Sequence, residues 1–164
     1  METVYLETSF ISYLVSEPSR DVIVAGHQQI TRAWWAQRRH EFACCVSDAV
    51  WKEASRGDPQ QAQRRLELLR ELPRLPITPE VERLARTILE SGALPPVAFP
   101  DAVHIAVAAA EHVNYLLTWN CKHIANAVRL RRIEEIFRSR NLYLPRVATP
   151  EGLMGENWKF EDLL

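Results

Sequence analysis

Four side chains that carry oxygen atoms stand where apolar segments begin or end: Glu7, Glu53, Asp101 and Asn120. Glu7 and Asn120 each follow a strand-like run, Asp101 opens an alanine-rich helix, and Glu53 follows Val50-Trp51-Lys52. Oxygen side chains that converge at strand ends make a site for a hard cation such as Mg²⁺. Sites in an open α/β sheet form beyond the carboxyl ends of the strands. A divalent cation there would activate water and orient a phosphodiester. The pattern therefore predicts a metal-dependent nuclease.

Each of these residues, taken singly, has a simpler explanation. An acidic residue in the first turn of a helix, as at Asp101, commonly interacts with the helix dipole. Glu53 alone would be typical of a solvated helix face. The prediction therefore rests on the four residues together, as the catalytic and metal-binding set, and it assigns no protein side chain as the nucleophile.

Two further polar residues are candidates for substrate binding. Ser9 either contacts a metal-bound water or a phosphate, or caps the turn between strand and helix. His104 lies three residues after Asp101 on the same helix face, so it either contacts the substrate or is a hydrogen-bonded structural histidine. Ser47 or Asp48 is expected to cap the helix that carries Val50 and Glu53, and His123 is expected at the surface.

The elements that must position these side chains follow from alternating strand-like and helical patterns. Thr8-Ser9 can cap the first helix, and Thr78-Pro79-Glu80 is typical of a helix start, with proline in the first turn. Strands that alternate with helices imply a parallel sheet covered on both faces. We expect strands over residues 4–6, 42–46, 75–77, 115–118 and near 146–148, and helices over residues 10–15, 22–40, 48–56, 60–72, 79–91, from 101 onward, and 125–139.

The length of 164 residues is typical of a single domain with a sizeable core. Hydrophobic residues make up 47% of the chain and charged residues 25%, an ordinary globular composition. We expect one nuclease domain over residues 1–150 and an appendage over residues 151–164 that is either packed or a docking peptide. The formal net charge of −1 provides no overall basic field, so any contact with RNA would use local patches.

The three cysteines, Cys44, Cys45 and Cys121, have neither the number nor the spacing of a disulfide framework or a zinc site. We expect them to be small buried hydrophobes. The N-terminus lacks the pattern of a signal peptide, and the longest apolar run, residues 102–110, is far shorter than a membrane span. These observations predict a cytoplasmic protein with no membrane segment.

The basic residues between the last two predicted strands have two interpretations. The arginines of residues 125–140, with Lys122, either form a phosphate-binding rim or make solvated ion pairs with Glu134 and Glu135, and we favour ion pairs for most of them. Long amphipathic helices are a common dimer surface, so a homodimer is expected. The tryptophans expected in a core or an interface are Trp34, Trp35 and Trp51.

Four segments carry a resemblance to a known family. They are Val4-Tyr5-Leu6-Glu7-Thr8-Ser9, Ser47-Asp48-Ala49-Val50-Trp51-Lys52-Glu53, Pro100-Asp101-Ala102-Val103-His104-Ile105-Ala106 and Leu116-Leu117-Thr118-Trp119-Asn120. In order and context they resemble the PIN domain and, within it, the VapC-like toxin nucleases of toxin–antitoxin pairs. The resemblance covers residues 3–150. It implies a three-layer α/β/α sandwich around a mostly parallel sheet of four to five strands.

The same resemblance implies an endoribonuclease that uses Mg²⁺ or Mn²⁺, with RNA as substrate and a small antitoxin protein as partner. This sequence departs from the family at two positions, because Glu7 and Asn120 stand where the family usually or often has aspartate. Three carboxylates balance one divalent ion and a phosphate more readily than two ions, since affinity for hard cations follows ligand charge.

Two other functional classes compete with the nuclease. A catalytically weak or silent PIN fold would bind RNA or a protein without cleavage, and the residues that favour it are Glu7 and Asn120. A phosphoacceptor signalling domain also carries acids at strand ends, but it would need an accepting aspartate beside an acidic pair, and no such arrangement is present. Affinity for Mn²⁺ separates the nuclease from the silent fold.

Overall fold

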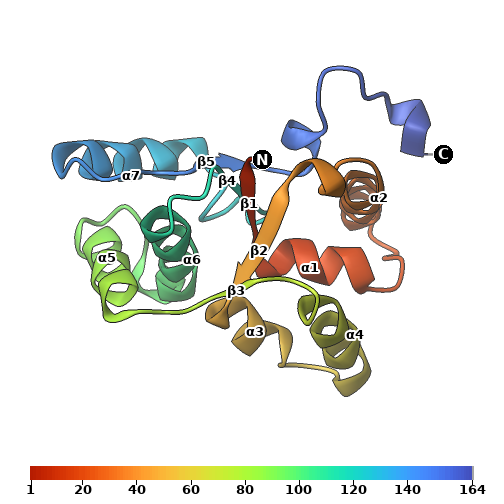
Figure 1. Cartoon of the computed structure of the whole chain (residues 1–164), viewed down its shortest axis with the longest axis horizontal. Coiled ribbons are helices and arrows are strands. Elements are labelled where there is room, and N and C mark those ends of the chain that lie inside the picture. Colours follow the sequence, from red (N-terminus) through yellow and green to blue (C-terminus); the bar gives the residue numbers. More distant parts are fainter. Residues whose placement is uncertain (164) are drawn as a thin grey trace.

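Five parallel strands form a single sheet in the order β3-β2-β1-β4-β5. The computed structural model describes residues 1–163 (Figure 1). The strands are β1 Thr3–Leu6, β2 Ala43–Ser47, β3 Arg74–Leu75, β4 Tyr115–Leu117 and β5 Arg146–Ala148. In the register of the sheet, Val4 of β1 lies opposite Cys44 on one side and Tyr115 on the other. The prediction of a parallel sheet of four to five strands is confirmed.

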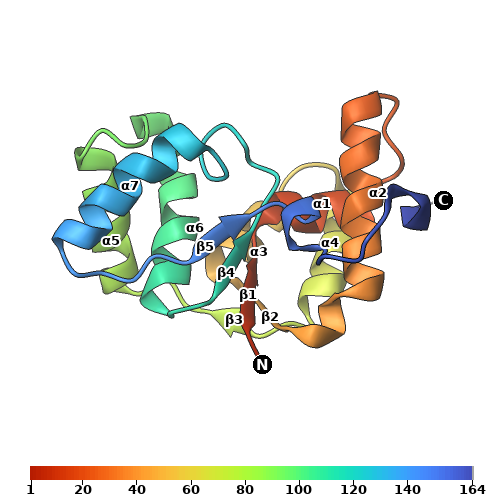
Figure 2. The same cartoon turned by 90° about the horizontal axis from the view of Figure 1, so that it is seen from above.

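Within residues 1–163, six α-helices cover the two faces of the sheet and a seventh lies at its edge (Figure 1). Helices α1, α2 and α4 lie on one side and α5, α6 and α7 on the other, while α3 lies by the β3 edge (Figures 1 and 2). This is the α/β/α sandwich expected from the sequence. The helices are α1 Thr8–Val15, α2 Val22–Gln37, α3 Asp48–Ala54, α4 Pro59–Leu69, α5 Pro79–Glu90, α6 Phe99–Ala110 and α7 Ala127–Ser139. Among residues 1–163, none of the helices is long and apolar enough to cross a bilayer.

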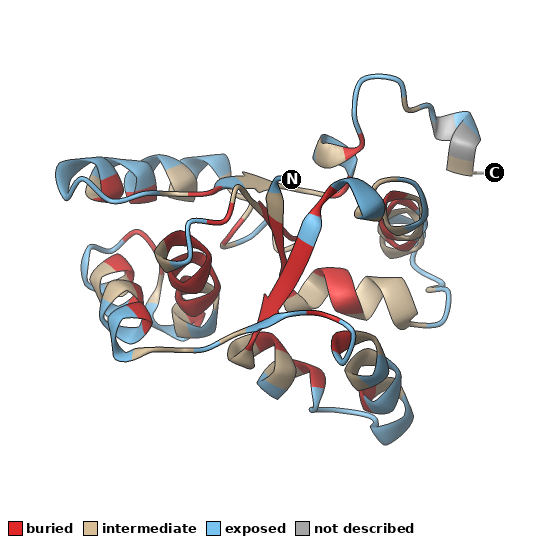
Figure 3. Ribbon diagram, in the orientation of Figure 1, coloured by how far each residue is buried: buried red, intermediate tan, exposed pale blue. Residues whose placement is uncertain are grey.

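The core lies between the sheet and its helices, and β1, β2 and α6 are largely buried (Figure 3). Val4, Tyr5 and Leu6 have no exposed surface, as expected for the middle strand of a covered parallel sheet. All eight residues from Ala102 to Ala109 are buried in α6. The small alanine side chains let this helix approach both the sheet and α5 closely, which fixes the position of Asp101 and His104.

Element boundaries differ from the sequence-based expectations by a few residues. Helix α1 begins at Thr8 because Glu7, and not Thr8 or Ser9, is its N-cap. Helix α6 begins at Phe99, two residues before Asp101, with proline in its first turn. Strand β3 ends at Leu75, because the following proline has no N–H to donate to the sheet.

The segment after β5 packs against α2. Its two short 3₁₀ helices span Glu151–Leu153 and Phe160–Leu163. The Nε1 of Trp34, which is fully buried, donates to the carbonyl of Leu153 over 3.1 Å, and Met154 is also buried. Between the two interpretations of this segment, the packed arrangement is the one observed; the domain limit at residue 150 stays a prediction.

The cysteines are all free. Cys44 and Cys45 are buried in β2, as predicted. The expectation that Cys121 is also buried was wrong, because this residue lies in the exposed turn after β4.

Candidate metal centre

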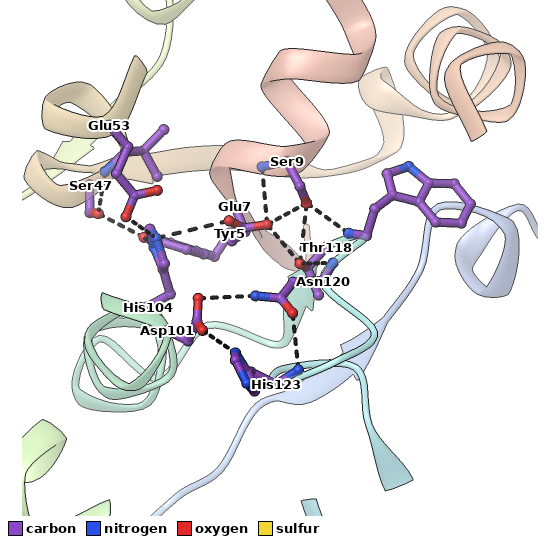
Figure 4. Close-up of polar contacts among 12 residues, drawn as sticks. Tyr5, Glu7, Ser9, Ser47, Glu53, Asp101, His104, Thr118, Asn120 and His123 are labelled. Atoms are coloured by element: carbon purple, nitrogen blue, oxygen red, sulfur yellow. Dashed lines mark hydrogen bonds and ion pairs between the residues drawn. The ribbon is translucent and has the colours of Figure 1, made fainter. Parts of the chain in front are cut away.

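The candidate site lies where the connections of the sheet reverse direction. From β1 the chain crosses to β2 and β3 on one side, and from β3 it returns to β4 on the other side of β1. Ligands bind in the crevice that such a switch opens beyond the carboxyl ends of the strands. Glu7 directly follows β1 and Asn120 lies three residues beyond β4, so both reach this crevice (Figure 4).

Glu7 is buried, with 5% of its surface exposed, and its carboxylate is held by donors on Oε2. This oxygen accepts a hydrogen bond from the backbone N of Ser9 at 3.1 Å, one from the Thr118 hydroxyl at 2.7 Å, and a short one from the Ser9 hydroxyl. The same Ser9 oxygen accepts the backbone N–H of Trp119 at 2.8 Å. Glu7 therefore caps α1 and is also fixed to the segment after β4.

Glu53 and His104 form the second part of the site. His104 Nε2 lies 2.9 Å from Glu53 Oε1 and 4.0 Å from Glu7 Oε1. Its other ring nitrogen, Nδ1, lies 2.7 Å from the Tyr5 hydroxyl, which lies 2.7 Å from the hydroxyl of Ser47. Burial of the tyrosine, partly opposed by the Ser47 hydrogen bond, raises the pKa of Tyr5 well above its usual value.

The ionisation of this pair is set by opposing effects. Burial disfavours the charged form of Glu53, but the hydrogen bond and the charge of His104 outweigh it, so the pKa of Glu53 is lowered. Burial likewise disfavours the charged form of His104, but the hydrogen bond to Glu53 and the neighbouring carboxylates raise the pKa of His104. His104 and Glu53 thus each favour the charged form of the other.

Three ligand atoms lie close enough together to hold a cation. One atom each from Glu7, Glu53 and His104 lies within 4.8 Å of the others. Two carboxylates and an imidazole, presented from β1, α3 and α6, are groups that bind divalent metal ions. The residues present therefore fit a divalent cation.

Asp101 and Asn120 lie beside this cluster and bind each other. Asn120 Nδ2 donates to Asp101 Oδ1 over 3.0 Å, and His123 Nδ1 lies 2.8 Å from Asp101 Oδ2. Asn120 Oδ1 accepts the backbone N–H of His123 at 3.0 Å. The expectation that His123 lies at the surface was wrong, since 14% of its side chain is exposed and it pairs with a candidate ligand.

The four predicted ligands thus gather at one end of the sheet, in two adjoining groups. Thr118 joins them, because its hydroxyl donates to Glu7 and accepts the backbone N–H of Asn120 at 2.9 Å. Their roles as ligands stay predictions. Sequence reasoning did not single out Tyr5, Thr118 or His123; the one signal was that each lies within three residues of a candidate ligand or of its strand end.

The two residues predicted to bind substrate occupy different positions. Ser9 lies at the first turn of α1, with its hydroxyl directed to Glu7 and to the chain after β4. His104 is 1% exposed and has protein partners at both ring nitrogens. Its contact with a substrate stays a prediction, and its contacts with the acids are observed. Ser47, one of the two residues expected to cap α3, is the N-cap, while Asp48 pairs with Arg74.

The family model for the PIN domain matches residues 4–127. This chain belongs to the PIN domain family. Two solved structures are similar to it in fold. VapC20 from Mycobacterium tuberculosis, a toxin that cleaves the sarcin-ricin loop, is 18% identical with a TM-score of 0.56, over 75% of this chain and 94% of VapC20. VapBC2 from Rickettsia felis, bound to promoter DNA, is 16% identical with a TM-score of 0.53, over 90% of this chain and 98% of that chain. No curated protein matches the sequence.

A cavity and an aromatic stack lie near the acidic residues of this PIN domain. A cavity of about 360 Å³ beside Glu53 is lined by side chains that include Lys52, Arg56 and Phe99. On the side of α1 and α2, the rings of His27 and Trp119 stack with their centroids 4.0 Å apart. Trp119 is buried and its Nε1 donates to the Thr31 hydroxyl over 2.7 Å, so this stack is part of the packing between α2 and the segment after β4.

Helix α7 of the PIN domain carries the basic residues for which two interpretations were open. Arg131 pairs with Glu135 at 3.5 Å, and both side chains are exposed. Arg129 donates to the carbonyl of Ala93 over 3.1 Å, so part of its charge ties α7 to the loop before α6. Of the two interpretations, these contacts favour the structural one over phosphate binding. Arg131 forms a solvated ion pair, and Arg129 holds α7 to the neighbouring loop.

Proposed function

We propose that this PIN domain is a metal-dependent endoribonuclease that hydrolyses phosphodiester bonds of RNA. The observation that carries the proposal is the convergence of Glu7, Glu53 and His104, whose ligand atoms lie within 4.8 Å of one another, with Asp101 beside them. They meet at the crevice where ligands bind to open α/β sheets. The family supports a nuclease, and Mg²⁺ or Mn²⁺ is the cofactor we propose.

The described side chains have separable tasks in this reaction. A bound divalent cation lowers the pKa of water and offsets charge on the phosphate. Ser9 and Thr118 hold the Glu7 carboxylate at a fixed angle, and His104 holds Glu53. Asn120 and His123 each contact one oxygen of Asp101 and so orient its carboxylate. Fixed carboxylates of this kind avoid reorganisation when charge develops on the phosphate.

We further propose that the protein is the toxin of a toxin–antitoxin pair. The support is the likeness of its fold to VapC20, described as a toxin, and to VapBC2, described as bound to a promoter fragment. The partner would be a small antitoxin whose segment covers the crevice and places a basic side chain among the carboxylates, where charge-assisted hydrogen bonds form. A cytoplasmic homodimer is part of the same proposal.

The proposed activity is tested by cleavage of a labelled RNA with Mg²⁺ or Mn²⁺, with a chelator control. Asp101→Asn removes charge without removing volume, so it should abolish metal-dependent cleavage and leave the fold intact. Glu134→Gln, an exposed position on α7, is the matched control and should cleave like the wild type. Cleavage by Asp101→Asn at the wild-type rate would refute the assignment.

A wild-type protein that binds Mn²⁺ only weakly and does not cleave would instead support the silent PIN fold. The antitoxin is tested separately, by co-expression with the adjacent small gene and purification through a tag on either product. We expect a complex in which cleavage is inhibited. Failure to co-purify, or a complex as active as the free protein, would favour a free-standing RNA-processing enzyme.

A further inference from the structure

We propose that His104 is a nitrogen ligand of the metal centre, and that it makes the centre selective for Mn²⁺ and similar transition metals over Mg²⁺. This inference rests on the proposed function only in placing a divalent ion between Glu7 and Glu53. It assigns to His104 a role different from contact with substrate. The ion would be bound by Oε1 of Glu7, Oε1 of Glu53 and Nε2 of His104.

The separations of these atoms suit one coordination sphere. Metal–ligand distances of about 2.1 Å in an octahedron place neighbouring ligand atoms about 3.0 Å apart and opposite ones about 4.2 Å apart. His104 Nε2 lies 2.9 Å from Glu53 Oε1 and 4.0 Å from Glu7 Oε1. The first value is close to that of neighbouring ligands and the second to that of opposite ones, and one ligand atom from each of the three residues lies within 4.8 Å of the others, so an ion can be bound with small side-chain movements.

The Glu7 carboxylate is already oriented for this role. All three hydrogen bonds from Ser9 and Thr118 fall on its Oε2 atom. The other oxygen, Oε1, faces His104 at 4.0 Å, beyond hydrogen-bond distance. A carboxylate of a residue only 5% exposed is stabilised when a cation binds its free oxygen, because burial otherwise penalises the charge.

The contacts of the other ring nitrogen determine how His104 can bind a metal. Binding requires the lone pair of Nε2, so the ring proton must reside on Nδ1. From there it can be donated to the Tyr5 oxygen 2.7 Å away, and the Tyr5 hydroxyl can donate to Ser47 at 2.7 Å (Figure 4). Metal-binding histidines commonly have such a partner at the second nitrogen, which fixes the ring.

The ligand set determines which ions are preferred. Mg²⁺ favours oxygen ligands and retains its water molecules, whereas imidazole binds later divalent metals more strongly. A centre made only of carboxylates would not distinguish the two classes in this way. The addition of the His104 imidazole to the two carboxylates therefore predicts a shift in selectivity toward Mn²⁺, and this prediction does not depend on whether RNA is cleaved.

The direct test is pulsed electron paramagnetic resonance of Mn²⁺ bound to the full-length protein. Wild-type protein should show nitrogen modulation that changes when histidine is labelled with ¹⁵N, a comparison that needs no mutation. His104→Asn should remove the modulation and lower Mn²⁺ affinity by roughly tenfold, with a smaller effect on Mg²⁺. His112→Asn is the control, because His112 is exposed and has a φ of 50°, which asparagine tolerates.

A second pair of variants separates His104 from its neighbours. Tyr5→Phe keeps the ring and removes the hydroxyl, and should retain the modulation with weaker Mn²⁺ binding. His123→Asn, which removes the partner of Asp101, should also retain it. Absence of nitrogen modulation in the wild type would overturn the inference. So would loss of the modulation in His123→Asn, or a preference of His104→Asn for Mn²⁺ over Mg²⁺ equal to that of the wild type. A histidine-bound ion without RNA cleavage would refute the proposed function and leave the inference standing.

Discussion

The Asn120 amide donates to the Asp101 carboxylate over 3.0 Å, so an uncharged side chain stabilises the charge of this acid through a hydrogen bond. Asn120→Asp would place two carboxylates at this distance without a donor between them. The metal-free variant should lose about 1.5–3 kcal/mol of stability, the value of a hydrogen bond to a charged group. Added Mn²⁺ should restore the loss, because four carboxylates bind a divalent ion more tightly than three.

The measurements are thermal unfolding with and without Mn²⁺ and calorimetric titration with Mn²⁺. Asn141→Asp is the matched control, since Asn141 is exposed and has a φ of 54°, which aspartate also tolerates. Equal or weaker Mn²⁺ binding by Asn120→Asp would show that residue 120 is not near the metal.

The Thr118 hydroxyl connects the two groups of the site, since it donates to Glu7 and accepts from the backbone of Asn120. Thr118→Val keeps the shape and removes both contacts at a fully buried position. We expect a loss of about 1.5–3 kcal/mol in urea unfolding. Thr87→Val, whose hydroxyl only bonds to the preceding turn of α5, should change stability by about 0.5 kcal/mol or less. Similar effects of the two variants would contradict this account.

The thiols should differ in reactivity with pH. Burial raises the pKa of Cys44 to about 11 and that of Cys45 to about 12, so at pH 8 only on the order of one Cys44 in a thousand is a thiolate. A thiol reagent should therefore modify one residue, the exposed Cys121, in native protein at pH 8, and all three in urea. Labelling of the buried pair should rise steadily with pH through pH 10. Rapid modification of native Cys121→Ser at pH 8 would contradict the prediction that the two buried thiols are unreactive.

Two glycines should respond oppositely to alanine. A Cβ at Gly26, inside α2, meets no atom within 4 Å, so Gly26→Ala should stabilise the protein by about 0.8–1.0 kcal/mol through helix propensity. Gly92 follows α5 with a φ of +77°, and Gly92→Ala should destabilise by roughly 1–2 kcal/mol. Differential scanning calorimetry compares them directly, and a rise in melting temperature for Gly92→Ala would be inconsistent with the described turn.

Much of the fold followed from local patterns. Apolar runs predicted the five strands to within a few residues, and Thr78 with its following proline predicted the start of α5. Sequence position could also indicate that Glu7 and Asn120 reach one edge of a parallel sheet. It could not show that Glu7 caps α1, because the identity of an N-cap depends on the residue at which the strand ends and the helix begins.

The pairings within the site depend on distances across elements and could not be predicted. His123 contacts Asp101 across 22 positions, and His104 contacts Glu53 across 51. Nothing in the spacing of these residues distinguishes a buried partner from a surface histidine. The packing of α6 against the sheet decides both contacts.

The strand order also determines when the site can exist during synthesis. β1 is made first and ends in the middle of the sheet, but its neighbour β4 and the segment that carries Asn120 and His123 come from the last third of the chain. During synthesis Glu7 lacks its Thr118 donor until residue 118 is added, and Asp101 lacks Asn120 and His123 until residues 120 and 123 are added. A nascent polypeptide that ends before residue 123 therefore carries an incomplete centre, so a cell meets the complete one only after β4 and the turn that follows it have been made.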